Sequence, residues 1–188
     1  MVKVWDPLVR LFHWGLVLSF ATAWLSAGHA KTLHHWAGYV AAALLAIRVA
    51  WGLVGTRYAR FTQFVRGPGA ALSYLRDIAG GDERRFVGHN PAGGAMVVVL
   101  IAGVALQVLT GWLATTDMFF GVDWVEQAHQ LLSKLLLGLV VLHLLGVAIA
   151  SLRHRENLPG AMLTGRKRPR HGARMAPRTH LPAKVTRR

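Results

Sequence analysis

Residues 129–143 read HQLLSKLLLGLVVLH, a nearly unbroken run of Leu and Val with a histidine at each end. With its apolar flanks the run covers about 127–152, more than the roughly 20 residues that an α-helix needs to cross a bilayer. In lipid a helix satisfies its own backbone hydrogen bonds. The stretch therefore predicts a membrane-spanning helix that carries two imidazoles.

Three further runs are long and apolar enough to span a membrane. They lie at about 11–28, 34–55 and 93–116, and the third, GGAMVVVLIAGVALQVLTGWLA, contains no charge. The first run has no small-residue cleavage site, so we read it as a retained anchor and not as a signal peptide. Residues 1–163 are thus expected to form an all-α integral membrane four-helix bundle.

The composition supports this fold class. Hydrophobic residues make up 53% of the 188 residues and charged residues 16%, whereas soluble domains carry roughly 25% charged residues. Cysteine is absent. This excludes disulfides, Cys-ligated iron–sulfur clusters and the covalent attachment of c-type haem.

The charges predict the orientation. The 56–92 segment carries six arginines and the tail is strongly basic, whereas the connection between the third and fourth spans has only acidic charges: Asp117, Asp123 and Glu126. Basic loops stay on the cytoplasmic side. Both termini and the 56–92 loop are therefore expected in the cytoplasm.

The sequence also predicts the structure of two segments outside the spans. PGAALSYLRDI, at 68–78, predicts a short amphipathic helix on the membrane surface. Residues 164–188 are basic, interrupted by Pro and without apolar periodicity, which predicts a disordered cytoplasmic tail. Next to a membrane, such a tail favours anionic lipid head groups, and we expect no nucleic-acid partner.

The histidines can be paired by depth. Fourteen residues turn a helix by roughly 1,400°, so His129 and His143 share one face about 21 Å apart. His13 begins the first span at the cytoplasmic side, and His34 begins the second span at the outer side. His13 and His143 then match in depth, as do His34 and His129. Two opposed imidazoles from different helices suit six-coordinate haem iron, so two haem b groups are expected.

Other residues of the second span fit this interpretation. His35 is the alternative to His34 as ligand. Gly38 lies one turn after His34 and would leave room for a haem edge, although glycine also aids ordinary helix packing. Arg48 follows His34 by 14 residues, so it lies on the same face at the cytoplasmic end, where it would pair with a haem propionate or extend to the interface.

A second hypothesis is that the same histidines bind or conduct a transition-metal ion, since imidazole suits zinc, copper and nickel. Such an ion prefers clustered ligands, whereas these histidines fall in two layers. The spans also contain no carboxylate.

At these residues the chain resembles the bacterial cytochrome b561 family and the related b-type cytochrome subunits of nickel–iron hydrogenases. The resemblance is carried by VWDPLVRLFHW at the start, LHHWAGY, WGLVG after Arg48, GHNPAGG before the third span, and the pair His129 and His143. It covers about residues 4–165.

The resemblance implies a dihaem cytochrome of the bacterial inner membrane, with His13, His34, His129 and His143 as axial ligands. Such a protein passes electrons between a redox partner and the quinone pool. The partner would be a periplasmic c-type cytochrome or an oxidoreductase subunit, and we place a bound quinone by the cytoplasmic haem, near Arg48, Trp51 and the start of the third span. Whether the chain works alone or as the cytochrome subunit of a quinone-linked oxidoreductase stays open, because the extra helix usual in hydrogenase subunits is not found.

Overall fold

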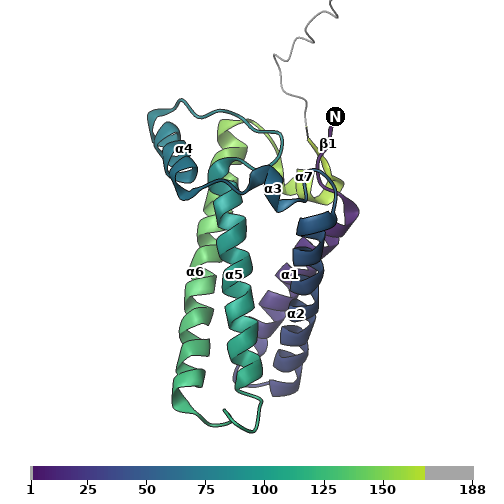
Figure 1. Ribbon diagram of the computed structural model, residues 1–188, viewed down its shortest axis with the longest axis vertical. Helices are drawn as coiled ribbons and strands as arrows, with labels where there is room; N and C mark the ends of the chain where they lie inside the picture. Colours follow the sequence, from purple (N-terminus) through teal and green to yellow (C-terminus); the bar gives the residue numbers. More distant parts are fainter. Residues whose placement is uncertain (1, 168–188) are drawn as a thin grey trace, which may run out of the picture.

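The computed structural model describes residues 2–167 and confirms four long helices. They are α1 (Pro7–Ser26), α2 (Lys31–Val54), α5 (Pro91–Leu113) and α6 (Asp123–Arg153), all long and apolar enough to cross a membrane. They run side by side along the long axis (Figure 1). The described part adds the short elements β1 (Val2–Lys3), α3 (Phe61–Phe64), α4 (Pro68–Gly80), α7 (Leu158–Thr164) and β2 (Arg166–Lys167).

The bundle consists of two helical hairpins. α1 packs along α2, α5 packs along α6, and α2 contacts α5. The interior between them is built on Leu45, Val104 and Leu136. Many large apolar side chains point outward instead; Leu25, for example, is 72% exposed. Lipid would cover these side chains in the membrane.

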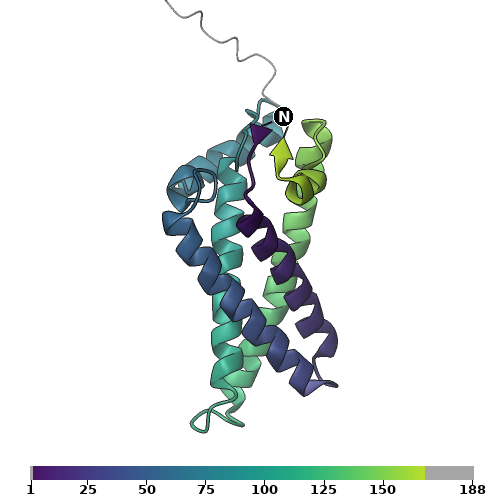
Figure 2. The same ribbon diagram turned by 90° about the vertical axis from the view of Figure 1, so that its right-hand side faces the viewer.

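The two ends of the bundle differ. We call the end with the α1–α2 and α5–α6 connections the hairpin end, and the opposite end, with β1, β2, α3, α4 and α7, the terminal end. Figures 1 and 2 show both strands at the terminal end, so the N-terminus and the last described residues lie on the same side of the bundle. Whether this side is cytoplasmic remains a prediction.

Asp-Pro and Asn-Pro pairs start two of the long helices. The Asp6 carboxylate accepts a hydrogen bond from the backbone N of Val9 at 2.9 Å, and Asn90 Oδ1 accepts one from Gly93 at 2.6 Å. Proline follows each cap, where its missing N–H costs nothing.

Asp6 also joins the start of α1 to the end of α2. Its carboxylate accepts hydrogen bonds from Trp51 Nε1 at 3.0 Å and from the Thr56 hydroxyl. Burial alone would raise the pKa of Asp6, but these bonds, with those from the backbone of the first turn, hold the pKa below its ordinary value. Asp6 is therefore a buried carboxylate that keeps its charge.

The predicted short helix in the central loop is confirmed as α4. It packs against α5, and the Tyr74 hydroxyl donates to the carbonyl of Arg84 at 3.0 Å. Leu72 and Leu75 are exposed, as a helix on a lipid surface requires. Contact with lipid remains a prediction.

The start of the predicted tail differs from expectation. Arg166 and Lys167 form β2, which pairs antiparallel with Lys3 and Val2 of β1. A disordered tail from residue 164 is therefore wrong for its first residues, because backbone pairing to the N-terminus orders them. Residues 168–188 of that tail lie outside the described part.

Gly165, just before β2, is required by its surroundings. It has a φ of +77°, and an added Cβ would lie 2.6 Å from the carbonyl oxygen of Trp5. The carbonyl oxygen of Gly165 also accepts a hydrogen bond from the backbone N of Val4 at 2.9 Å, which joins the two chain ends. A side chain at this position would push the two chain ends apart.

We expect Gly165→Ala to destabilise the protein more than Gly28→Ala does. Gly28 has a similar φ of +86° but nothing within 4 Å of an added Cβ, so it reports the left-handed strain alone, roughly 1–2 kcal/mol. The clash at Gly165 adds roughly 1–3 kcal/mol. Thermal unfolding in detergent compares the stabilities of both variants. Equal losses of stability would show that the contact between Gly165 and Trp5 leaves room for a side chain.

Candidate functional site

His34 and His129 meet at the hairpin end. Their ring centroids are 6.1 Å apart, with the planes at 79°. His34 Nδ1 lies 2.8 Å from the carbonyl oxygen of Ala23 in α1, so Nδ1 carries the proton and Nε2 is left with a lone pair. Neighbouring His35 is exposed. The structure thus brings together the outer pair that includes His34.

The separation of this pair suits a shared metal. Two metal–imidazole bonds of about 2 Å, added to the distance from each ring centre to its nitrogen, give a centroid separation of roughly 6 Å. A hydrogen bond from the second ring nitrogen to a backbone carbonyl is also a common feature of ligating histidines, and His34 has one. The hairpin-end pair therefore fits bis-imidazole ligation of haem iron.

Helix α5 forms a cradle for the His129 ring. Thr110 Oγ1 lies 3.1 Å from Nδ1, and Gln107 Nε2 lies 3.1 Å from Nε2 and 3.3 Å from Nδ1. A Cβ added at Gly111 would lie 2.9 Å from Cε1 of the ring. The sequence reasoning missed all three residues. The signal for Gln107 and Thr110 is a pair of polar side chains, one turn apart, in an otherwise apolar span.

Gly111→Ala is expected to weaken haem binding at this pair. The new methyl group would displace the His129 ring at a cost of about 1–3 kcal/mol, or roughly 5- to 100-fold in affinity. Gly138→Ala in α6 is the matched control, since nothing lies within 4 Å of a Cβ there. Haem retention during dialysis against apomyoglobin compares the two, and equal retention would argue against the cradle.

His13 and His143 lie near each other toward the terminal end. They are close enough for their charges to interact, although no ring contact or hydrogen bond joins them in the described part. Both are half-buried, and the Nδ1 atom of His13 is buried with no partner. The second predicted pair is therefore brought to one region but not into contact, and the unpartnered nitrogen is left for a bond to another group.

Arg48 is buried beside this pair. It is 3% exposed, and its guanidinium carbon lies 4.8 Å from the Phe61 ring centre and 5.9 Å from that of Phe12. Its Nη1 atom is buried without a hydrogen-bond partner. A cation buried among rings is costly unless an anion reaches it. Arg48 therefore does not extend to the interface, and a carboxylate such as a haem propionate fits its free N–H groups.

His89 lies at the same end, in the loop that precedes α5. Its ring centroid is 4.7 Å from that of Trp5 and 4.5 Å from that of Phe64, and its Nδ1 is buried without a partner. Burial, followed by the charges of Arg48, Lys167 and His143, lowers the pKa of His89 to about 3. It is thus a neutral imidazole facing the same cationic region.

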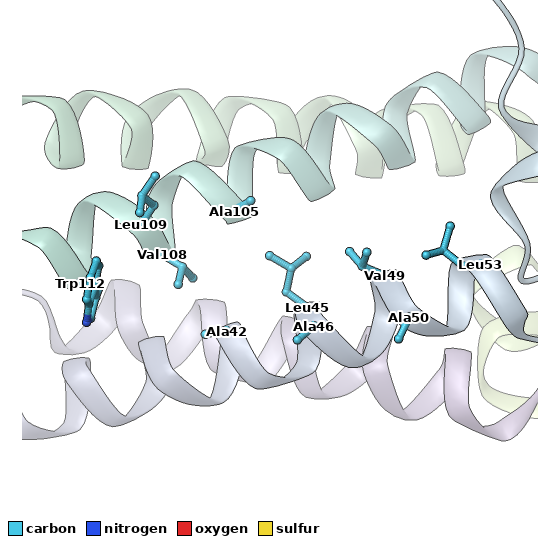
Figure 3. Close-up of a pocket in the computed structure, with 10 residues that line it drawn as sticks. All are labelled: Ala42, Leu45, Ala46, Val49, Ala50, Leu53, Ala105, Val108, Leu109 and Trp112. Atoms are coloured by element: carbon cyan, nitrogen blue, oxygen red, sulfur yellow. The ribbon is translucent and has the colours of Figure 1, made fainter.

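Space next to the helices is apolar. An added Cβ at Gly38 meets nothing within 4 Å, which leaves the room that the sequence reasoning assigned to a haem edge. Between α2 and α5 lies a groove of about 680 Å³, which Ala42, Ala46, Leu53, Ala105 and Trp112 help to line (Figure 3). None of the predicted ligands lines this groove, so it is separate from the histidine pairs.

The alternative of a bound transition-metal ion gains no support. Between residues 2 and 167, no three His, Asp or Glu side chains gather as a metal-ligand set. His34 and His129 are the two predicted ligands that come into ring contact, at the hairpin end.

Comparison with known proteins gives one match. The family model described as prokaryotic cytochrome b561 matches residues 4–165, which include both histidine pairs and Arg48. No curated protein and no solved structure matches the chain.

Proposed function

Since the chain belongs to the prokaryotic cytochrome b561 family, we propose that it is a dihaem cytochrome that exchanges electrons with the quinone pool. Membership makes it a multi-pass membrane protein that binds b-type haem and transfers electrons. The proposal goes beyond family membership in four respects: the number of haems, their ligands, the quinone and the direction across the membrane.

His34 and His129 would hold one haem and His13 and His143 the other. The observation that carries this assignment is the approach of His34 and His129 to 6.1 Å, with the Nδ1 of His34 bonded to a backbone carbonyl. Bound haem would supply one-electron ferric/ferrous chemistry at each level. At the rise of an α-helix, these levels would lie about 21 Å apart along α6, and the aliphatic residues between them would keep water out.

Arg48 would hold a propionate of the haem between His13 and His143. Its unpartnered Nη1 and its burial support this role. Gly38 would leave space for the edge of the other haem. Trp51 is not free to bind a ligand, because its N–H is donated to Asp6, so we place the quinone ring near Arg48 and not near the indole.

The terminal end is proposed to face the cytoplasm of a bacterial inner membrane. It carries the arginines of the 56–92 segment, whereas Asp117, Asp123 and Glu126 lie at the hairpin end. A periplasmic c-type cytochrome or an oxidoreductase subunit would then meet the hairpin end. The groove between α2 and α5 is lined by apolar side chains and suits the isoprenoid tail of a quinone better than its polar ring.

The test is reduction of the purified, oxidised full-length protein by a short-chain quinol without oxygen. We expect the sharp absorption bands of reduced b-type haem to appear, and dithionite to add little more. Bands that form with dithionite but not with the quinol would contradict the quinone assignment. A protein without such bands in either case would contradict the haem assignment itself.

A further inference from the structure

Thr110 carries a buried hydroxyl in the last turn of the apolar helix α5, and it contacts a predicted haem ligand. It is 9% exposed, and its Oγ1 lies 3.1 Å from His129 Nδ1. The same Oγ1 lies 2.9 Å from the carbonyl oxygen of Leu106, one turn earlier in the helix. A backbone carbonyl can only accept, so the single hydroxyl proton of Thr110 is donated to Leu106.

This assignment determines the state of the His129 ring. With its own proton donated to Leu106, Oγ1 accepts from His129, so Nδ1 carries the imidazole proton. Nε2 then has a lone pair. The Gln107 amide nitrogen lies 3.1 Å from Nε2 and 3.3 Å from Nδ1, so iron would take the place of this amide at Nε2. His129 is thus held in the tautomer whose Nε2 can bind iron.

Resting on the proposed function, we propose that Thr110 is a positioning residue that presents Nε2 of His129 to the iron and lowers the midpoint potential of that haem alone. An acceptor on the N–H of a ligating imidazole makes the ring a stronger electron donor. A stronger donor stabilises ferric over ferrous iron, and this lowers the potential.

The effect is confined to one haem because the two pairs differ. At the hairpin end the ring nitrogens of both histidines are bonded, His34 to the Ala23 carbonyl and His129 to Thr110. At the other pair, His13 Nδ1 is buried with no partner. Of the two Nδ1 bonds at the hairpin end, the one to Thr110 is made by a side chain and can be removed by substitution.

Thr110→Val removes the acceptor at nearly constant volume, and Thr110→Ser keeps it. The control is Thr116→Val, because Thr116, in the turn after α5, also donates to a backbone carbonyl three residues earlier, that of Leu113 at 2.7 Å, but makes no hydrogen bond to a histidine in the described part. Potentiometric titration of the purified protein, followed at the b-type absorption bands, measures the midpoints of both haems.

We expect one midpoint to rise in Thr110→Val and the other to stay, with Thr110→Ser and Thr116→Val both close to wild type. The shifted haem is identified by repeating Thr110→Val in His143→Ala protein, which should keep only the haem of His34 and His129. Unchanged midpoints, equal shifts of both, or the same shift in Thr116→Val would overturn the proposal.

If Thr110→Val loses haem from both levels, Thr110→Ala replaces it and is judged by the same criteria. Selective loss of one haem, restored by serine, would support the proposal. A wild-type protein without two b-type components would contradict the proposed function first. Two wild-type components with unchanged midpoints in the variant would contradict this inference alone.

Discussion

Replacement of His143 by alanine is expected to leave the protein with one haem where the wild type has two. His143 is the proposed ligand from α6 at the terminal end, and alanine removes both nitrogens of its imidazole ring. The hairpin-end pair lies about 21 Å away along the same helix and should keep its haem. Haem extraction and quantification per chain measure the difference.

His154→Ala is the control for this variant, because His154 caps the end of α6 beyond the long apolar run. It should retain both haems. Retention of both haems by His143→Ala would show that His143 is not a ligand. Loss of both haems would mean that the two levels do not fold independently.

The second large effect separates two adjacent histidines. His34→Ala is expected to lose the hairpin-end haem, whereas His35→Ala is expected to keep both haems. His34 approaches His129 and has its Nδ1 bonded to the Ala23 carbonyl, while His35 is exposed. Visible spectra of the reduced variants, normalised to protein, compare the two.

The reverse result, with haem lost from His35→Ala and kept in His34→Ala, would exchange the ligand assignment. Loss of haem in both variants would show that the first turn of α2 must be intact for reasons other than ligation. Because the two residues are adjacent, general damage to the helix should affect both variants alike, which makes the pair a strict comparison.

The spans, and the shared face of His129 and His143, were predictable because they depend on one helix at a time. Hydropathy located the four long helices, Asp6 and Asn90 mark starts that proline reinforces, and a separation of 14 residues places His129 and His143 on one face. These features follow from local geometry. They need no knowledge of which helices are neighbours.

The support around the ligands was not predictable in this way. Thr110 and Gly111 matter because α5 packs beside α6 in one rotational register, and a single sequence does not contain that register. His89 looked like a surface residue because its loop is short and polar, yet Trp5 and Phe64 enclose its ring. The pairing of β1 with β2 joins residues at opposite ends of the described chain and has no local signal.

The proposed function requires two histidine pairs that each hold a low-spin haem between neighbouring helices. Quantifying haem per chain in the purified wild-type protein, together with electron paramagnetic resonance of its ferric form, addresses this directly. We predict two haem b per chain, both six-coordinate and low-spin. A single haem, or a high-spin signal from iron with an open axial position, would contradict it.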